Sequence, residues 1–351
     1  MLDQSEIVSY LLSLGVVKPR EVVDGELTVA DASRRNSVFL VTTRRGATYV
    51  VKQGSLGTAA TLNHEAAVLR ALARSPELAG HVPVVVRHDA VDACLVLRSP
   101  AGAPDWSEHH GTGRFPRTPA RALGRLLAAV HAMSPSGIDE APPGVDPMWG
   151  LSLPAPRYET FLEMSAGARD VVERLQASPR TCERLEALRA DVGDGAFVHG
   201  DLRWENCLAV GAPGSRRRTR VVLIDWELSG RGAPAFDVGT ILAEYLRVWV
   251  GSIPIVSPTD PGRLVADALH PLSAMHPAIA AFWSAYARAS ARPFALRRVV
   301  ELAAVRLLQI ATERAGGLNA PTAHVVTLVQ LADNMLAAPD MAAIGILGLR
   351  G

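Results

Sequence analysis

The stretch from residue 197 to residue 239 constrains the fold more than any other part of the chain. It reads FVHGDLRWENCLAV, then a basic turn that contains Gly and Pro, then VVLIDWELSGRGAPAFDVG. Asp201 and Asn206 lie in its first half, and Asp225 follows the apolar run in its second half. Oxygen atoms of carboxylates and carboxamides are the ligands that Mg²⁺ prefers. Such groups on turns and strand ends predict a site for magnesium and a nucleotide.

The composition limits the class of protein. A chain of 351 residues exceeds one average domain, which predicts two lobes around a cleft. The net charge of +1 gives no general attraction to nucleic acid or to an anionic membrane. The three cysteines, Cys94, Cys182 and Cys207, form no CxxC pair, which is typical of a reducing cytoplasm. We expect no signal peptide and, because no run of 18 apolar residues occurs, no membrane span.

The first part of the chain predicts a small lobe built on a sheet. Helical periodicity predicts helices over residues 4–14 and 62–72. Strands are predicted over residues 26–30, 37–42, 48–53, 82–88 and 93–97. Pro and Gly interrupt the pattern over residues 98–104 and predict a hinge. We therefore expect an N-lobe over residues 1–98, an antiparallel sheet with one inserted helix.

The remainder, residues 99–351, predicts a large and mainly helical C-lobe. Helices are predicted over residues 119–133, 158–175, 181–188, 237–249, 261–269, 278–289, 296–315 and 322–336. The Pro- and Gly-containing residues 142–156 predict a loop, and the docking of the tail from Met341 cannot be predicted. The expected fold class is α+β with two lobes.

The spacing of polar residues in the central stretch predicts phosphoryl transfer. Asp201 and Asn206 have the spacing of a phosphotransferase catalytic loop, in which the Asp accepts the proton of the attacking hydroxyl and the Asn binds metal. Asp225 at a strand end can bridge two phosphates through magnesium, with Glu227 as an extra ligand. Arg203 can neutralise the charge that develops on the transferred phosphoryl group.

The N-lobe supplies the complementary nucleotide-binding groups. Lys52 ends the segment YVVK and is expected to direct its ammonium group at the α- and β-phosphates of ATP. Glu65 is its expected partner, although Glu77 is an alternative and Glu65 could be a solvated helix acid. The turn between the first two strands is expected to form the phosphate lid, through Ser33, Ser37, the intervening arginines or backbone amides. Adenine is expected to bind backbone groups of residues 97–99, from Leu97 to Ser99.

These motifs together resemble the aminoglycoside phosphotransferase/choline kinase family. The likeness rests on HGDLRWEN, IDWE and APAFDVG, with VVK and LGRLLAAVHAM adding support, so it covers most of the chain. It implies the bilobal protein-kinase-like fold and the site roles given above. It also implies that Asp237 is a structural Asp that braces the catalytic loop. Because Asp201 fills the role of the base, His199 is expected to be structural.

Three departures from that family's pattern leave questions open. The lid has no glycines, Arg203-Trp204 replaces a His-Pro pair, and residues 211–220 lengthen the turn before Asp225. Trp204 could stack on the acceptor or pack under the loop. His109-His110 is expected to lie in a loop and not at a metal, and Tyr286 is expected in the core, where an aromatic residue could also line the acceptor cleft.

The predicted activity is ATP- and Mg²⁺-dependent phosphorylation of an alcohol in the cytoplasm. The acceptor could be a hydroxylated small molecule or antibiotic. It could also be Ser or Thr of a precursor peptide, because SRRNS…VVKQ resembles lanthipeptide-type kinases, which act with a lyase in the pathway. A basic cluster disfavours a polycationic acceptor; its members are Arg288, Arg292, Arg297 and Arg298. The alternative is a catalytically silent kinase-like binding module. A metal-dependent hydrolase is disfavoured, since no His-rich ligand set accompanies the carboxylates.

Overall fold

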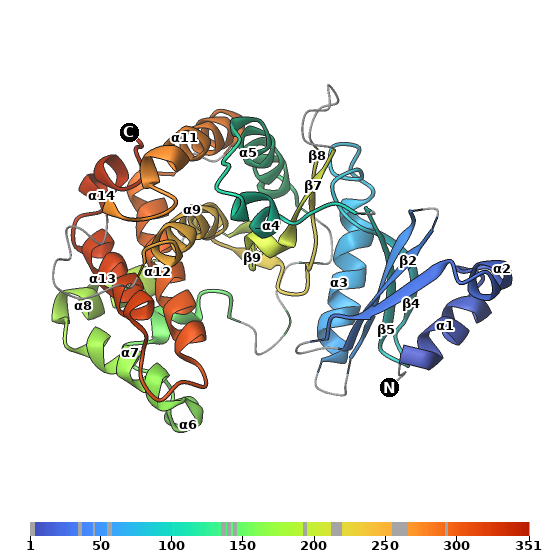
Figure 1. The fold of residues 1–351 in the computed structure, drawn as a ribbon. Helices are drawn as coiled ribbons and strands as arrows, with labels where there is room; N and C mark the ends of the chain where they lie inside the picture. The colour runs from blue at the N-terminus through green and yellow to red at the C-terminus, as the bar shows by residue number, and fades with distance from the viewer. Residues whose placement is uncertain are drawn as a thin grey trace. The chain divides into compact units, whose positions relative to one another are not determined.

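The computed structural model describes most of the chain. The described residues are 4–33, 37–44, 46–54, 58–100, 102–134, 138, 142, 146–191, 195–211, 220–254, 266–291 and 294–350. They form two compact units (Figure 1). The first unit comprises Met1–Trp106, Ser134–Val145 and Glu205–Gly230, and the second comprises Ser107–Met133, Asp146–Trp204 and Arg231–Gly351. The expected division between residues 98 and 99 stays a prediction.

The first unit is built on a five-stranded antiparallel sheet. Its strands are β1 (Leu27–Asp31), β2 (Ser37–Thr43), β3 (Thr48–Gln53), β4 (Val84–Asp89) and β5 (Cys94–Ser99). They are ordered β1-β2-β3-β5-β4, so β5 lies between β3 and β4. The helix α3 (Ala59–Leu72) follows β3, as predicted, and α1 (Gln4–Ser13) and the short α2 (Pro19–Val23) precede the sheet.

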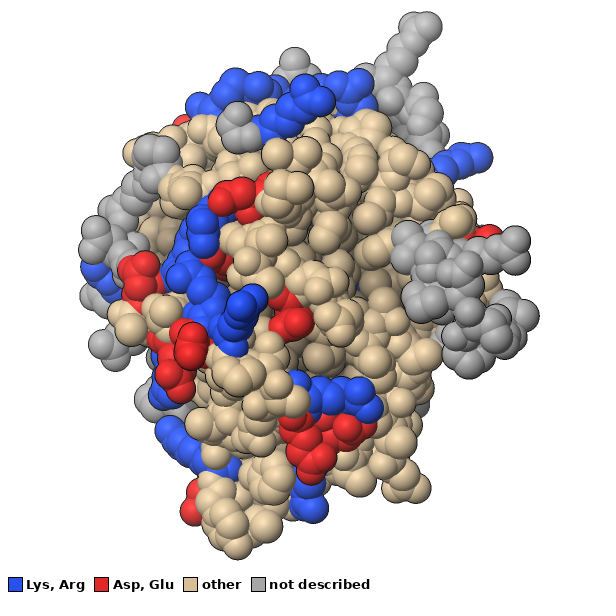
Figure 2. All heavy atoms as spheres, turned by 90° about the vertical axis from the view of Figure 1, so that its left-hand side faces the viewer, with Lys and Arg blue, Asp and Glu red and all other residues tan. Residues whose placement is uncertain are grey.

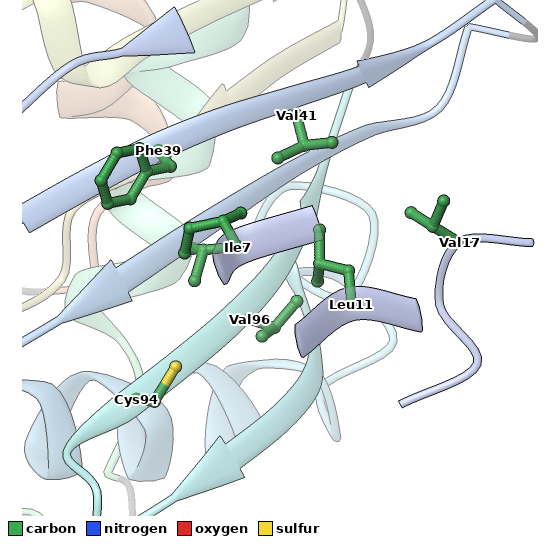
Figure 3. Close-up of a cluster of buried hydrophobic side chains, with 8 residues drawn as sticks. Ile7, Leu11, Val17, Phe39, Val41, Cys94 and Val96 are labelled. Carbon is green, nitrogen blue, oxygen red and sulfur yellow. The ribbon is translucent and has the colours of Figure 1, made fainter. Parts of the chain in front are cut away.

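A buried apolar cluster joins α1 to the sheet. Ile7 and Leu11 of α1 are fully buried in one cluster with Val41 and Val51. Figure 3 shows this cluster with most of its members labelled. Successive strand residues point to opposite faces of a sheet. Val51 therefore belongs to this cluster while its neighbour Lys52 bonds Glu65 of α3. Along β3, one face therefore packs in the apolar cluster and the other face carries the polar side chain of Lys52.

A second antiparallel pair completes the first unit. The strands β7 (Cys207–Val210) and β8 (Arg220–Leu223) pair so that Cys207 lies opposite Leu223. The backbone of Ala209 also donates to the carbonyl of Pro104 at 2.9 Å. Asn206 directly precedes this hairpin and Asp225 follows it, so both polar residues lie at one end of it.

The second unit is helical apart from the short pair β6 (Ala196–Val198) and β9 (Gly230–Gly232). Its helices are α4 (Trp106–Gly111), α5 (Arg117–His131), α6 (Tyr158–Glu163), α7 (Ala166–Gln176), α8 (Pro179–Ala190), α9 (Pro234–Gly251), α11 (Leu272–Ala289), α12 (Leu296–Ala315), α13 (Ala323–Ala337) and α14 (Pro339–Gly345). The 3₁₀ turns are η1 (Trp149–Ser152) and η2 (Trp204–Asn206). α12 is largely buried and packs against α9 and α13.

Some expected elements differ from the structure. The single helix expected over residues 158–175 is two helices, α6 and α7, because Ser165 caps α7 by accepting a hydrogen bond from the amide of Ala168 at 3.2 Å. His109 and His110 lie in α4, where a loop was expected. The tail forms α14, after which Leu347 is fully buried. The helix expected over residues 261–269 lies largely outside the described residues.

No helix among the described residues combines the length and the hydropathy that crossing a bilayer requires.

Candidate active site

Lys52 is the centre of the polar site in the first unit. Its Nζ lies 2.9 and 2.8 Å from the two carboxylate oxygens of Glu65 and 2.7 Å from Oδ1 of Asp225. The Lys52 side chain is 10% exposed, that of Glu65 is fully buried and that of Asp225 is 30% exposed. The ammonium group is therefore shared between a buried carboxylate and one that reaches solvent. Glu65, and not Glu77, is the partner of Lys52.

The charge state of Lys52 follows from these contacts. Burial by itself lowers the pKa of a lysine. The charges of Glu65 and Asp225 outweigh that effect, so the pKa of Lys52 lies above its ordinary value. The ammonium group stays protonated across the physiological range and presents a fixed positive charge beside Asp225. That charge is the type needed to bind a phosphate oxygen.

The β7–β8 hairpin brings Asn206 and Asp225 to the same end of two strands. Asn206 directly precedes β7, and Asp225 follows β8 after Ile224. The amide of Ile224 donates to the carbonyl of Asn206 at 3.0 Å, which extends the pairing up to the polar residues. Asn206 is buried, and Asp225 has a φ of 65°, in the left-handed region that disfavours a non-glycine residue. A strained backbone of this kind is typical of functional sites.

Two further contacts tie the segment after Asp225 to α3. The amide of Trp226 donates to Glu65 at 3.4 Å, and Nε2 of His64 lies 2.7 Å from the carbonyl oxygen of Ser229. Glu227, the expected extra metal ligand, lies between them and is half-buried. Within the described residues, no group of three or more His, Cys, Asp and Glu side chains could hold a metal. Mg²⁺ is commonly held by one or two carboxylates together with substrate phosphates, and the oxygen donors of Asn206 and Asp225 fit that mode.

In the second unit, Asp237 organises the residues around Asp201. Its fully buried carboxylate accepts from the amides of His199 at 2.7 Å and Gly200 at 3.0 Å. Nε2 of His131 lies 3.1 Å from the same carboxylate. Burial raises the pKa of Asp237, but the hydrogen bonds that it accepts from the His131 side chain and from the His199 amide outweigh that effect, so the pKa lies below its ordinary value. An ionised Asp237 therefore holds the backbone just before Asp201.

Asp201 itself is held by its neighbours. Its amide donates a hydrogen bond to Nδ1 of His199 at 3.3 Å. This bond and the full burial of His199 favour a structural role for that histidine. Its carboxylate pairs with Arg203, whose Nη2 lies 2.9 Å from Oδ2. The next residue, Trp204, is fully buried and stacks on His110 with 4.4 Å between ring centroids. Trp204 therefore packs under the loop. The chain passes from the second unit to the first directly after this residue.

The expected lid and adenine residues all lie in the first unit. Ser33 follows β1 and accepts from the amide of Val38 at 3.0 Å, while its own amide donates to Asp31 at 2.8 Å. Ser37 begins β2, and residues 34–36 of the lid lie outside the described residues. Leu97 is buried opposite Val50, and β5 continues to Ser99, where the hinge was expected.

Sequence reasoning missed His64, His131 and Tyr286 as members of these networks. Each interacts with a residue more than a hundred positions away, with 165 positions between His64 and Ser229 and 155 between His131 and Tyr286. One signal was available, because His131 ends the apolar stripe of α5, where a buried polar side chain needs a partner.

Comparisons with known proteins identify the family of the chain and the proteins that share its fold. The profile of the phosphotransferase enzyme family, APH, matches residues 26–294. Viomycin phosphotransferase of Streptomyces vinaceus is 30% identical over 164 residues, which are 45% of this chain and 53% of that protein. The chain therefore spans about half the length of the curated relative that it matches.

Solved structures share the fold. A choline/ethanolamine kinase family protein of Mesorhizobium loti has a TM-score of 0.55 and 19% identity, covering 96% of each chain. An ADP-bound aminoglycoside phosphotransferase has a TM-score of 0.51 and 14% identity, covering 95% of this chain and 99% of that one. The predicted α+β kinase-like fold is confirmed. Since the family profile covers more than half of the sequence, this chain belongs to the APH phosphotransferase enzyme family.

Proposed function

We propose that the protein transfers the γ-phosphoryl group of ATP to a hydroxyl group in a Mg²⁺-dependent reaction. The observation that carries the proposal is the buried ammonium group of Lys52, bonded to both Glu65 and Asp225. A silent binding module has no need to keep this ion pair together with an Asp at a strained strand end. The ADP bound to an aminoglycoside phosphotransferase of the same fold supports a nucleotide ligand.

Each side chain has a defined part in this proposal. Asp201 accepts the proton of the attacking hydroxyl, since a carboxylate in hydrogen-bonding reach can act as general base. Arg203, now paired with Asp201 at 2.9 Å, neutralises charge on the transferred phosphoryl group. Lys52 binds the phosphates. Ser33 and Ser37 contribute to the lid, and the backbone of residues 97–99 binds adenine.

The metal-binding residues of the proposal are Asn206 and Asp225, with Glu227 as an additional ligand. Bound Mg²⁺ would neutralise charge on the phosphate oxygens. The hairpin fixes Asn206 and Asp225 at one end of two paired strands, so the chain need not reorganise to present both. Their hard oxygen donors suit this cation over softer metals.

For the acceptor, we propose a hydroxylated small molecule of the antibiotic class, because the curated relative phosphorylates viomycin by name. The basic cluster is not a reason to exclude a polycationic acceptor, because two of its arginines are paired with acidic residues. Arg297 pairs with Glu301 at 3.2 Å and with Asp340 at 3.2 Å, and Arg298 bonds Asp191. Basic and acidic side chains also lie next to one another on the face drawn in Figure 2. Charge therefore does not exclude a cationic acceptor.

The test measures phosphate transfer from ATP to viomycin, with a panel of aminoglycosides, choline and Ser/Thr peptides as competing acceptors. We expect phosphorylated product from a small molecule, and loss of turnover by about a thousandfold or more in Asp201→Ala, from loss of the base and its positioning. ATP binding, measured by calorimetry, should be retained in that variant. Glu173→Ala, which changes an exposed acid of α7, is the matched control.

Other outcomes would identify the alternatives. Product from peptides alone would support the precursor-peptide acceptor and a partner lyase. ATP binding without product from any acceptor would support the silent module and refute the enzyme.

A further inference from the structure

A chain of buried hydrogen bonds runs from α11 to the backbone of Asp201. The hydroxyl of Tyr286 lies 2.8 Å from Nδ1 of His131, whose Nε2 lies 3.1 Å from Asp237. Asp237 accepts hydrogen bonds from the amides of His199 and Gly200, and Nδ1 of His199 accepts one from the amide of Asp201. Tyr286, His131, Asp237 and His199 are each no more than 5% exposed. All of these residues belong to the second unit.

The donors and acceptors in this chain have a fixed order. An ionised Asp237 can only accept, so Nε2 of His131 must carry a proton. Burial raises the pKa of Tyr286 above its ordinary value, against a hydrogen bond from Ser290, so its hydroxyl keeps its proton. That proton can be donated to Nδ1 of His131, while Nε2 of the same ring donates to Asp237.

Close packing of α5 against α11 places the hydroxyl of Tyr286 beside His131. A Cβ at Gly124 of α5 would lie 2.4 Å from the carbonyl oxygen of Phe282 and 3.0 Å from the amide of Tyr286. The backbones of α5 and α11 are therefore in contact one turn from the Tyr286 side chain. The ring of Tyr286 also packs against His131, with centroids 5.5 Å apart, and against Phe294 at 5.6 Å. The geometry is thus fixed by packing and not by the hydrogen bond alone.

We propose that Tyr286 is a positioning residue for the catalytic loop, acting through His131 and Asp237. It touches no reacting atom; its hydroxyl holds the His131 ring in place, so that Nε2 stays bonded to Asp237 and Asp237 stays bonded to the two amides before Asp201. The inference rests on the proposed role of Asp201 as the base. In metal sites, partners that orient a histidine in this way typically account for about 10- to 100-fold of activity.

The test compares Tyr286→Phe with the intact protein. This change removes the hydroxyl and leaves the ring contacts. We expect kcat with ATP, Mg²⁺ and viomycin to fall about tenfold or more while the KM for ATP is unchanged. We also expect amide hydrogen exchange at His199 and Gly200 to accelerate by about tenfold or more, because their acceptor is no longer held.

The control is Ala287→Gly, an exposed position next to Tyr286 that weakens α11 through its backbone alone. It should lower the Tm without changing kcat or the exchange of the two amides. If it reproduces both effects of Tyr286→Phe, Tyr286 is merely structural and the proposal is overturned.

A double variant tests the route through His131. His131→Gln keeps an N–H donor for Asp237 but removes the ring nitrogen that receives the tyrosine proton. In that background, Tyr286→Phe should have little further effect on kcat or exchange. Independent, multiplying effects would overturn the proposal. If the intact protein phosphorylates no acceptor, the proposed function fails, but unchanged exchange in Tyr286→Phe would still be needed to refute this inference.

Discussion

At the scale of single residues, two buried charged groups each have more than one partner. Lys52 has Glu65 and Asp225, and Asp237 has His131 and two backbone amides. A buried ion pair adds little stability relative to apolar packing, but removal of one partner leaves a charge that water cannot reach. Such residues are therefore sensitive to single substitutions in a way that exposed charges are not.

The first prediction concerns Lys52→Met. It leaves the fully buried Glu65 without its ammonium partner, so we expect a loss of about 3–5 kcal/mol in the free energy of unfolding together with a higher KM for ATP. Urea unfolding and steady-state kinetics measure the two effects. Lys18→Met, at an exposed lysine, should change neither. Adding Glu65→Gln to Lys52→Met should recover part of the stability but none of the ATP affinity, and a failure to recover any would contradict this account.

The second prediction concerns pH. Because the pKa of Asp237 is lowered in the folded protein, its contribution to stability is fully present above its ordinary pKa of 3.8 and is lost as the pH falls below that value. Asp237→Asn should cost about 1.5–3 kcal/mol at pH 7, since hydrogen bonds to a charged group are lost. It should also reduce the slope of unfolding free energy against pH below 3.8. Equal slopes in the two proteins would show that folding does not lower the pKa of Asp237.

At the scale of elements, contacts between distant segments decide what the sequence could and could not predict. Period-2 and period-3.6 patterns predicted the five strands and most of the helices, because these patterns reflect which face of an element is buried. The Lys52–Glu65 pair could be predicted because motif order restricts the choice of partner. The interaction of His131 with Tyr286 could not, because no local pattern records how α5 and α11 cross. The break at Ser165 was missed because a cap competes locally with an apolar stripe that continues through it.

The third prediction tests the α5–α11 crossing. Gly124→Ala places a Cβ 2.4 Å from a backbone carbonyl oxygen, so the helices must separate. We expect a loss of about 1–3 kcal/mol, measured by thermal unfolding, as for other overpacked cores. Gly251→Ala is the matched control at the end of α9, where a Cβ meets nothing within 4 Å. That substitution should be neutral or slightly stabilising. Equal Tm values for the two variants would refute the close approach.

At the scale of the whole molecule, the stretch from residue 197 to residue 239 belongs to both units. Asp201 and Arg203 lie in the second, and Asn206 and Asp225 in the first. A ligand that binds the folded state alone stabilises it in proportion to the logarithm of its concentration. Nucleotide binding can therefore be measured as a rise in the free energy of unfolding, and this measurement does not require the acceptor to be known.

The fourth prediction follows. ATP with Mg²⁺ at about 100 times its Kd should stabilise the protein by about 2.7 kcal/mol, seen as a rise in Tm. A chelator, or Asn206→Ala, should remove most of that rise, because ATP would then lack the metal that Asn206 is proposed to hold. Asn334→Ala, an exposed asparagine of α13, should leave the rise intact. A shift that is indifferent to the chelator would contradict a magnesium site.

The apolar cluster that joins α1 to the sheet shows that the family profile and the folded unit begin at different residues. The family profile begins at residue 26, yet Ile7, Leu11 and Val17 fill the apolar face of β2, β3 and β5. A protein shortened to the profile would expose Val41 and Val51 as part of a hydrophobic surface, of the kind that promotes aggregation. Sequence similarity therefore marks where the shared chemistry begins, whereas the smallest part that can be produced in soluble form must begin earlier, at α1.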